Sequence, residues 1–241
     1  GGVVLNADGK PYVADAKGEF EAELQIPADA VPGQHPVVIS TTNPAIQAIA
    51  TLKISPSVPL SGEVLFQQSS VKLARGVYQS AISKKTGAIF VTSSVGRPPV
   101  KQSELLRLNG QTLAIEARAT PAAAPAAPGG LLAVYGIGLD DSQGNVWVTN
   151  TRQNTVAVYR QTDLSLVRQF EPGTVEHPRD IVVDESLGRA YSSANGTPHI
   201  AVFDAKNVSF TNHIEVRSTI RGKSFSAGSL YLDPIAHKLY T

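Results

Sequence analysis

Short runs of alternating hydrophobic and polar residues, separated by turn residues, recur through the second half of the chain. The clearest pair of copies is 139–150 and 183–194, and both place a glycine three positions before an aromatic residue. A polar residue stands seven positions before the aromatic one in four copies, which join Asp140 to Trp147, Asp184 to Tyr191, Ser83 to Phe90 and Asp233 to Tyr240. The aromatic anchors recur at intervals close to the length of one four-stranded propeller blade.

Each repeat predicts an antiparallel meander of four strands. In the second repeat the apolar run 132–139 leads into a turn at Asp140 and Gly144, and strands follow at 145–149, 156–159 and 164–170. The pattern predicts blades at 75–119, 131–171 and 178–217, and the opening hairpin of a fourth at 225–241. The first repeat carries an insertion around Arg97, and a Pro/Ala-rich stretch at 120–130 predicts a mobile loop between the first two blades.

The residues of the second repeat resemble a known family. The runs 146–150 and 154–159, with the later run 177–184, resemble the YVTN repeat of bacterial and archaeal cell-surface β-propellers, and 71–241 is most similar to the YncE-like branch. The third repeat departs from the motif, because Ser192, Ser193 and Ala194 replace Val-Thr-Asn. The resemblance implies a propeller of seven blades, so three blades and part of a fourth leave the ring open. In that family the run 63–73 corresponds to an outer strand that completes the final blade.

The first 54 residues follow a different pattern. Hydrophobic residues alternate with polar ones over 20–26 and 46–54, which predicts two half-buried strands in facing sheets. A turn is expected at 15–18 and another strand at 36–41. The amino-acid sequence of 13–33 is similar to the second half of bacterial Ig-like modules. We therefore expect an all-β chain with a partial Ig-like β-sandwich at 1–54, a Pro/Ser linker at 55–62 and an incomplete β-propeller at 63–241.

Composition narrows the possible functions. The 241 residues include no Cys, which excludes disulfides, thiol catalysis and cysteine metal sites and suits a bacterial envelope protein. There is no 18-residue apolar run, so no transmembrane segment is expected, and the absence of a leader and of an initial Met predicts an excised piece. The net charge of +1 falls short of the clustered Lys/Arg footprint of nucleic-acid binders and is read as scattered, solvated charge, so a nucleic-acid partner has only weak support.

Motifs for catalysis are missing from the sequence. The five histidines never stand two or four positions apart, and no HExxH, GxSxG or P-loop string occurs, so no catalytic residue, metal or cofactor is predicted. Asp140, Asp184 and Asp233 precede turns, where carboxylates cap backbone N–H groups, so turn capping is the expected role. Trp147 stands at an anchor position that predicts core packing.

One set of residues is a candidate binding site. In a propeller the first strand of every blade lines the central channel, so the loops that enter these strands converge at one face. The candidate ligand-binding residues at this channel mouth are Arg75, Tyr78, Tyr135, His177, Arg179 and Asp180. Aromatic rings and cations suit an anionic or aromatic ligand. The alternative is that Arg179 and Asp180 form a pair that ties neighbouring blades together.

The expected function is that of a non-enzymatic binding or adhesion protein of the cell envelope or cell surface. Its location would be extracytoplasmic, in the periplasm, in the cell wall or secreted, and its partner a protein or another envelope component. One alternative is a periplasmic propeller that binds a small anionic or aromatic ligand or nucleic acid. A second is a metal-dependent propeller enzyme such as a lactonase.

Overall fold

The structure is a computed structural model that describes residues 5–6, 9–22, 24–58 and 61–241. The chain divides into two compact units, Gly1–Gln68 and Ser69–Thr241. Within the described ranges the regular elements are strands and two short 3-10 helices, η1 (Glu63–Leu65) and η2 (Thr151–Gln153). No helix in these ranges is long and apolar enough to span a membrane. The predicted linker at 55–62 lies within the first unit and stays a prediction.

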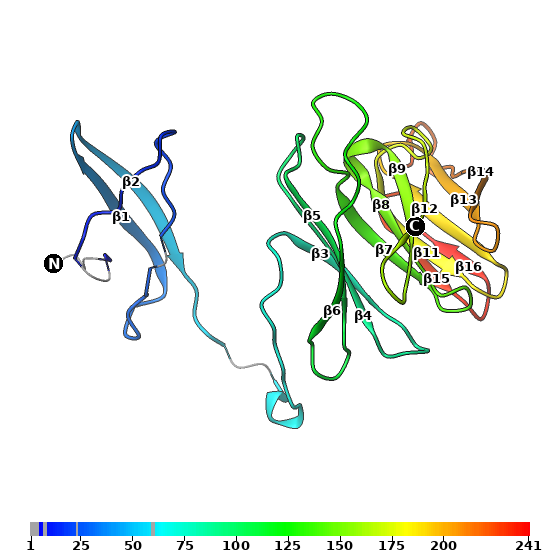
Figure 1. The fold of residues 1–241 in the computed structure, drawn as a ribbon, viewed down its shortest axis with the longest axis horizontal. Helices are drawn as coiled ribbons and strands as arrows, with labels where there is room; N and C mark the ends of the chain where they lie inside the picture. The colour runs from blue at the N-terminus through cyan, green and yellow to red at the C-terminus, as the bar shows by residue number, and fades with distance from the viewer. Residues whose placement is uncertain (1–4, 7–8, 23, 59–60) are drawn as a thin grey trace. The chain divides into compact units, whose positions relative to one another are not determined.

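The second unit contains three four-stranded antiparallel sheets and one two-stranded sheet (Figure 1). The first sheet consists of β3 (Val77–Ile82), β4 (Ile89–Val95), β5 (Gln102–Leu108) and β6 (Ile115–Ala119). The second consists of β7 (Val134–Asp140), β8 (Asn145–Asn150), β9 (Thr155–Arg160) and β10 (Leu166–Gln169). The third consists of β11 (Pro178–Asp184), β12 (Arg189–Ala194), β13 (His199–Asp204) and β14 (Ser209–Glu215). The hairpin of β15 (Tyr231–Asp233) and β16 (Lys238–Tyr240) is the fourth, so the predicted three blades and a part are confirmed.

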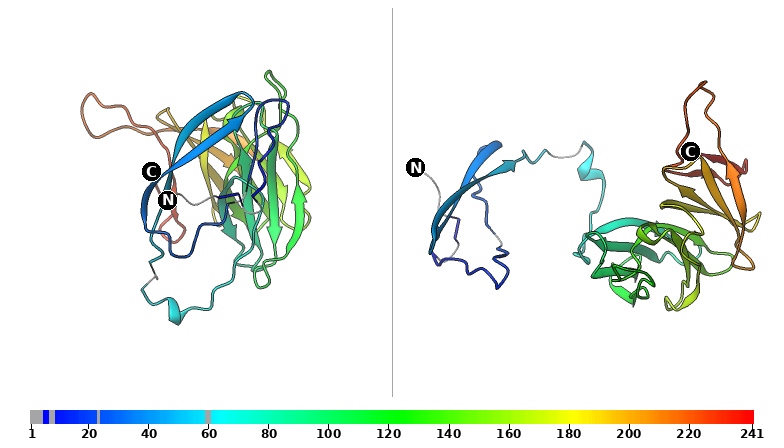
Figure 2. Two further views of the ribbon diagram at one scale, coloured as in Figure 1. Left: turned by 90° about the vertical axis from the view of Figure 1, so that its left-hand side faces the viewer. Right: turned by 90° about the horizontal axis from the view of Figure 1, so that it is seen from above.

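The first strands of successive sheets lie beside one another. Strand β7 contacts both β3 and β11, and β11 contacts β15, as expected if these strands face the centre of a propeller. Both views of Figure 2 show the connection from β14 to β15 extending away from the sheets. The inner strands therefore gather segments that are far apart in the sequence.

The first three aromatic anchors pack against the blade that follows them. Phe90 is buried against the second blade, and Trp147 is fully buried between the second and third, with ring centroids 6.1 Å from Phe170 and 5.5 Å from Phe203. Tyr191 packs against the fourth hairpin and is 8% exposed. Tyr240 is 52% exposed because no blade follows it in the described chain. The predicted packing role of Trp147 is confirmed.

Carboxylates cap the hairpin turns that join the first and second strands. Asp140 Oδ1 accepts hydrogen bonds from the Ser142 hydroxyl at 2.6 Å and the Gln143 N–H at 3.0 Å. Asp184 and Asp233 accept equivalent backbone bonds from the residues three positions later, at 3.1 and 2.9 Å. Turn capping is therefore confirmed as the role of these acidic residues.

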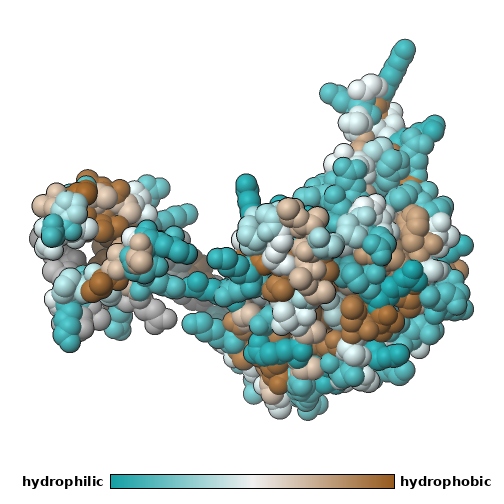
Figure 3. Space-filling view, turned by 45° about the horizontal axis from the view of Figure 1, so that its top comes forward, coloured by the Kyte–Doolittle hydropathy of each residue, from teal (hydrophilic) through white to brown (hydrophobic). Residues whose placement is uncertain are grey.

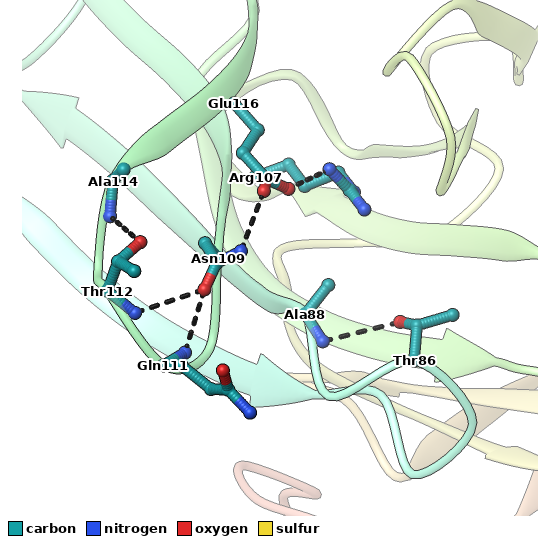
Figure 4. Close-up of polar contacts among 8 residues, drawn as sticks. All are labelled: Thr86, Ala88, Arg107, Asn109, Gln111, Thr112, Ala114 and Glu116. Carbon is teal, nitrogen blue, oxygen red and sulfur yellow. Dashed lines mark hydrogen bonds and ion pairs between the residues drawn. The ribbon is translucent and has the colours of Figure 1, made fainter.

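The turns between the third and fourth strands follow a second rule that sequence patterns did not predict. Figure 4 shows Asn109 Oδ1 accepting the N–H groups of Gln111 and Thr112, both at 3.0 Å. A non-glycine residue then adopts positive φ in all three full blades, namely Leu113, Leu164 and Val208. Leu164 is 2% exposed in the core between the first two blades. Core burial of this kind offsets the cost of the left-handed conformation.

Replacing Gly144 by valine is expected to destabilise the second blade by about 1–2 kcal/mol. Gly144 has φ +66, and no atom lies within 4 Å of an added Cβ, so the cost arises from the backbone conformation alone. Thermal unfolding would measure it, with Gly144→Asn as the control because asparagine tolerates this region. Equal melting temperatures for Gly144→Val and the wild type would contradict the turn assignment.

In the first unit the described residues form one two-stranded sheet, made of β1 (Gly33–Thr42) and β2 (Ala45–Ile54). The strand predicted over 20–26 is wrong for the described residues, which form no regular element there. The predicted second sheet is also not formed by the described residues. On β2, Ile46 and Ile49 are 57% and 74% exposed rather than half-buried. The turn at Asp15 is confirmed by its bonds to Lys17 and Glu19, and the Ig-like assignment stays a prediction.

The run 63–73, predicted as an outer strand, forms η1 and then irregular backbone. In the described part of the chain no strand pairs with this run. Val64 and Leu65 are 95% and 80% exposed, whereas Leu73 packs against the buried side chains of Val91 and Leu106 on the first blade. Figure 3 shows hydrophobic patches between hydrophilic residues on the surface.

The Pro/Ala-rich loop is tied to the insertion of the first blade, although we predicted a mobile loop. Val100 pairs with Gly130 in a parallel bridge, and Ala123 pairs with Leu131 in an antiparallel one. The Leu131 N–H donates to the Val100 carbonyl at 2.8 Å, and Val100 is fully buried. An added Cβ at Gly130 would lie 2.5 Å from the Val100 nitrogen, so this close approach requires glycine.

Candidate channel-mouth site

The structure brings two tyrosines and an arginine from three blades together. The rings of Tyr78 on β3 and Tyr135 on β7 lie 5.0 Å apart in an edge-to-face arrangement at 87°. Arg179 on β11 donates from Nε to the Tyr78 hydroxyl at 3.1 Å, across a sequence separation of 101 residues. Tyr78 is 44% exposed and Arg179 is exposed, so the cluster is open to solvent.

A β-bulge or similar irregularity occurs at the same place in the three full blades, where these side chains lie. The register between first and second strands shifts between Val77 and Gln79, between Val134 and Ile137, and between Pro178 and Ile181. The predicted site residues Tyr78, Tyr135, Arg179 and Asp180 all lie within these irregularities. A bulge turns a side chain out of the regular pleat, and bulges are common beside functional sites.

Close approach of β7 and β11 depends on a glycine. An added Cβ at Gly136 would lie 2.4 Å from the Arg179 carbonyl oxygen. Gly138 meets the Ile181 carbonyl in the same way at 2.7 Å. Because a side chain at Gly136 would push β11 away, the position of Arg179 relative to Tyr78 rests on this contact.

Asp180 and Gln79 tie the inner strands of the blades together. Asp180 Oδ1 accepts from Gln79 Nε2 at 3.4 Å, and its Oδ2 accepts the N–H of Leu230, beside β15, at 2.9 Å. Gln79 Oε1 accepts the N–H of Ile137 on β7 at 3.0 Å. Asp180 thus links neighbouring blades, as the alternative interpretation expected. It does so without an ion pair to Arg179, because Arg179 forms no ion pair in the described ranges. Gln79 was missed because a lone Gln carries no sequence signal.

Arg152 is a second cation that sequence reasoning missed. It lies in η2 directly after β8, and its guanidinium carbon stands 5.9 Å from the centre of the Tyr135 ring. Such a placement is a weak cation–π contact. Among the residues that the structure describes, neither Arg152 nor Arg179 is paired with a carboxylate. The candidate site therefore carries two guanidinium groups on one tyrosine pair.

The contacts of Arg75 and His177 involve other parts of the protein. Arg75 lines a groove on the first blade, and its carbonyl accepts from the Ser93 hydroxyl at 2.5 Å. His177, at φ 42, donates its N–H to Asn154 Oδ1 at 2.9 Å and accepts the Asn195 N–H at 3.4 Å. Its backbone fixes the loop before β11. The structure thus gathers Tyr78, Tyr135, Arg179 and Asp180, whereas Arg75 lines the groove on the first blade and His177 holds the loop before β11.

Comparisons with known proteins support the architecture. No protein-family model and no curated protein sequence matches the chain. Hydrazine synthase of Kuenenia stuttgartiensis is similar over 72% of this chain and 44% of that chain, with a TM-score of 0.53 and 15% identity. The structure of U3-55K is similar over 66% of this chain and 43% of that chain, with a TM-score of 0.50 and 10% identity. The repeats form part of a β-propeller.

The similarity concerns the fold alone, because sequence identities this low give no information about function. A gluconolactonase of Xanthomonas campestris has a TM-score of 0.46 at 16% identity, over 68% of this chain and 52% of that chain, which is too distant to bear on chemistry. This chain spans less than half the length of hydrazine synthase and U3-55K.

Carboxylates also join neighbouring blades of the propeller at the hairpin turns. Asp141 Oδ1 accepts from the Ser83 hydroxyl at 2.6 Å, and Asp184 Oδ2 lies 2.8 Å from His237 Nδ1 on the fourth hairpin. His237 has φ 53 and takes the place that Gly144 and Gly188 hold in their repeats. Among the described residues no group of three or more His, Cys, Asp or Glu is placed to hold a metal.

Acid is expected to remove the contribution of Asp184 to stability. Burial favours the neutral carboxyl, but hydrogen bonds from Ser186, His237 and Leu187 outweigh it and hold the pKa of Asp184 below its ordinary value of 3.8. A lowered native pKa means that this stabilisation is present above 3.8 and is lost as the pH falls through the native pKa. The difference in unfolding free energy between the wild type and Asp184→Asn is therefore expected to shrink below that pH. Urea titrations at several pH values would measure it, and a difference that grows with acid would contradict this account.

Proposed function

We propose that this protein is a non-enzymatic binding protein of the cell envelope or cell surface, related to the YVTN-repeat and YncE-like propellers. Its propeller unit is the interaction platform, and its N-terminal hairpin belongs to an Ig-like spacer. The propeller architecture supports the platform role, since propellers present the loops of several blades on one face.

The observation that carries the proposal is the pair of Tyr78, which is exposed, and Tyr135, which is half-buried, together with two exposed arginines. Tyrosine and arginine are enriched among the residues that dominate binding energy at protein interfaces. Arg179 donates a hydrogen bond from Nε to the Tyr78 hydroxyl, and no carboxylate in the described part of the chain pairs with its guanidinium group. The same is true of Arg152 over Tyr135. A partner that offers a carboxylate or phosphate to this face would form charge-assisted hydrogen bonds with both guanidinium groups.

A protein partner fits this surface better than catalysis does. The side chains that meet at the channel mouth are rings, guanidinium groups and amides, and Asp180 is already engaged by Gln79, Ile181 and Leu230. A metal-dependent lactonase would need several carboxylates and imidazoles at one point. A small anionic or aromatic ligand would use the same residues as the partner.

The test is binding of cell-envelope proteins to the immobilised full chain, followed by affinity measurement with the identified partner. Arg179→Ala is expected to weaken binding at least about tenfold, which is about 1.4 kcal/mol. Arg152→Ala is expected to weaken it less, because its contact with the ring is longer. Lys223→Ala removes an exposed cation elsewhere in the same unit and is expected to change nothing. Unchanged affinity in both arginine variants would refute the assignment of the site.

A further inference from the structure

A groove of about 620 Å³ lies on the first blade. It is lined by residues 72–75 before β3, by residues of β4, β5 and β6, and by a third set that we call the rim, namely Lys101, Thr120 and Leu131. All of these residues belong to the second unit, so the groove is formed within one compact body.

The rim is built from segments that the second and third blades do not have. Lys101 follows the insertion around Arg97, and Thr120 and Leu131 flank the Pro/Ala-rich loop. The bridge between Val100 and Gly130 holds these two segments together. The groove is thus a feature of the first blade and not a gap that recurs between strands of every repeat.

Charge in the groove is strongly unbalanced. Four basic side chains line it, Lys72, Arg75, Lys101 and Arg118, against one carboxylate, Glu104. Arg118 donates to Glu104 at 2.8 Å, and the two side chains are 52% and 33% exposed, so this pair is weak in water. Lys72 and Lys101 are exposed, and neither has an ion pair in the ranges that the structure describes. Such an excess of positive charge attracts an anion that carries more than one negative group.

The uncharged lining indicates which kind of anion fits. Gln102 and Thr120 are exposed and offer an amide and a hydroxyl for hydrogen bonds, while Leu73 and Leu131 offer apolar surface. The hydroxyls of Ser93 and Ser103 are already used inside the protein. None of the described lining residues is aromatic, so the groove has no platform on which nucleobases could stack. Sugar rings match hydroxyl, amide and aliphatic surface together.

We propose that this groove binds acidic carbohydrate, specifically a short run of uronic acid residues whose carboxylates pair with Lys72, Lys101 and Arg118. The site is separate from the tyrosine pair at the channel mouth, so it goes beyond the binding of a protein partner. It gives the protein a way to hold a polyanionic glycan while the propeller face remains open.

Isothermal titration calorimetry of the full chain with a hexamer of galacturonic acid tests the proposal. Binding is expected, and it weakens as salt is added because the pairs are exposed. The double variant Lys72→Ser, Lys101→Ser is expected to bind about tenfold more weakly, and Glu104→Gln about threefold more tightly. Lys223→Ser is the matched control for lost charge, and Arg179→Ala leaves uronate binding unchanged. These two variants separate a failure here from a failure of the channel-mouth proposal.

Three further ligands test whether the groove is specific for uronic acid. A glucose hexamer that binds as well as the uronate would show that charge is not recognised. A polyglutamate peptide or single-stranded DNA that binds more tightly through the same lysines would assign the groove to another class of partner. Absence of uronate binding, or equal binding by the lysine double variant and Lys223→Ser, would remove the site altogether.

Discussion

Replacing Trp147 by alanine is expected to lower the free energy of unfolding by about 4 kcal/mol, the largest effect of any single change considered. Trp147 is fully buried in the cluster that joins the second and third blades, where it packs on Phe170 and Phe203. Its removal leaves a cavity between two sheets that the backbone cannot close without breaking their strand pairing. Urea denaturation followed by far-UV circular dichroism would measure the loss.

Trp147→Phe is the control for this prediction. The indole Nε1 is buried and finds no hydrogen-bond partner among the described residues, and Phe90 occupies the same anchor position in the first blade. Phenylalanine keeps most of the ring volume and removes the unpaired N–H, so the cost is expected to be less than half that of alanine. A loss as large as that of Trp147→Ala would contradict the packing role and point to a specific need for the indole.

Gly136→Ala is expected to cost about 3 kcal/mol and to weaken partner binding as well. The new Cβ would lie 2.4 Å from the Arg179 carbonyl oxygen, and the obstacle is backbone, which cannot rotate aside. Strand β11 must then move away from β7, which separates Arg179 from Tyr78. Denaturation and affinity measurements on the same variant would report both effects.

Gly228→Ala is the matched control, because the atom nearest to an added Cβ there is a side-chain oxygen at 3.7 Å. Its unfolding free energy is expected to change by less than about 1 kcal/mol. If both glycine variants were equally stable, the close packing of the inner strands would be refuted.

The blades could be predicted from sequence because their signals are local. Asp140, Gly144 and Trp147 lie within one hairpin, where turn chemistry and alternation fix the strands. Part of the channel-mouth site could also be predicted from the sequence, because the inner strands of a propeller must converge. Gln79 and Arg152 could not be found in this way, because their roles depend on bulges and on contacts between blades.

The N-terminal unit shows where alternation misleads. The pattern over 20–26 and 46–54 is typical of half-buried strands, yet a strand is half-buried only when another layer covers it. Without that layer among the described residues, Ile46 and Ile49 stay exposed, and the run 20–26 finds no strand to pair with. Alternation indicates which face is apolar but does not supply the partner.

The inner strands of separate blades gather Tyr78 and Arg179 into one surface, and chemical cross-linking tests this arrangement directly. The chain has no cysteine, so Tyr78→Cys with Arg179→Cys provides a unique thiol pair for a short bifunctional maleimide. Ile82→Cys with Arg179→Cys is the control, because Ile82 is 63% exposed at the other end of β3. Mass spectrometry of the monomer is expected to find a peptide that links positions 78 and 179 and little link from 82. Reaction of both thiols without an intramolecular link, or equal linking in the control, would contradict the arrangement of the blades.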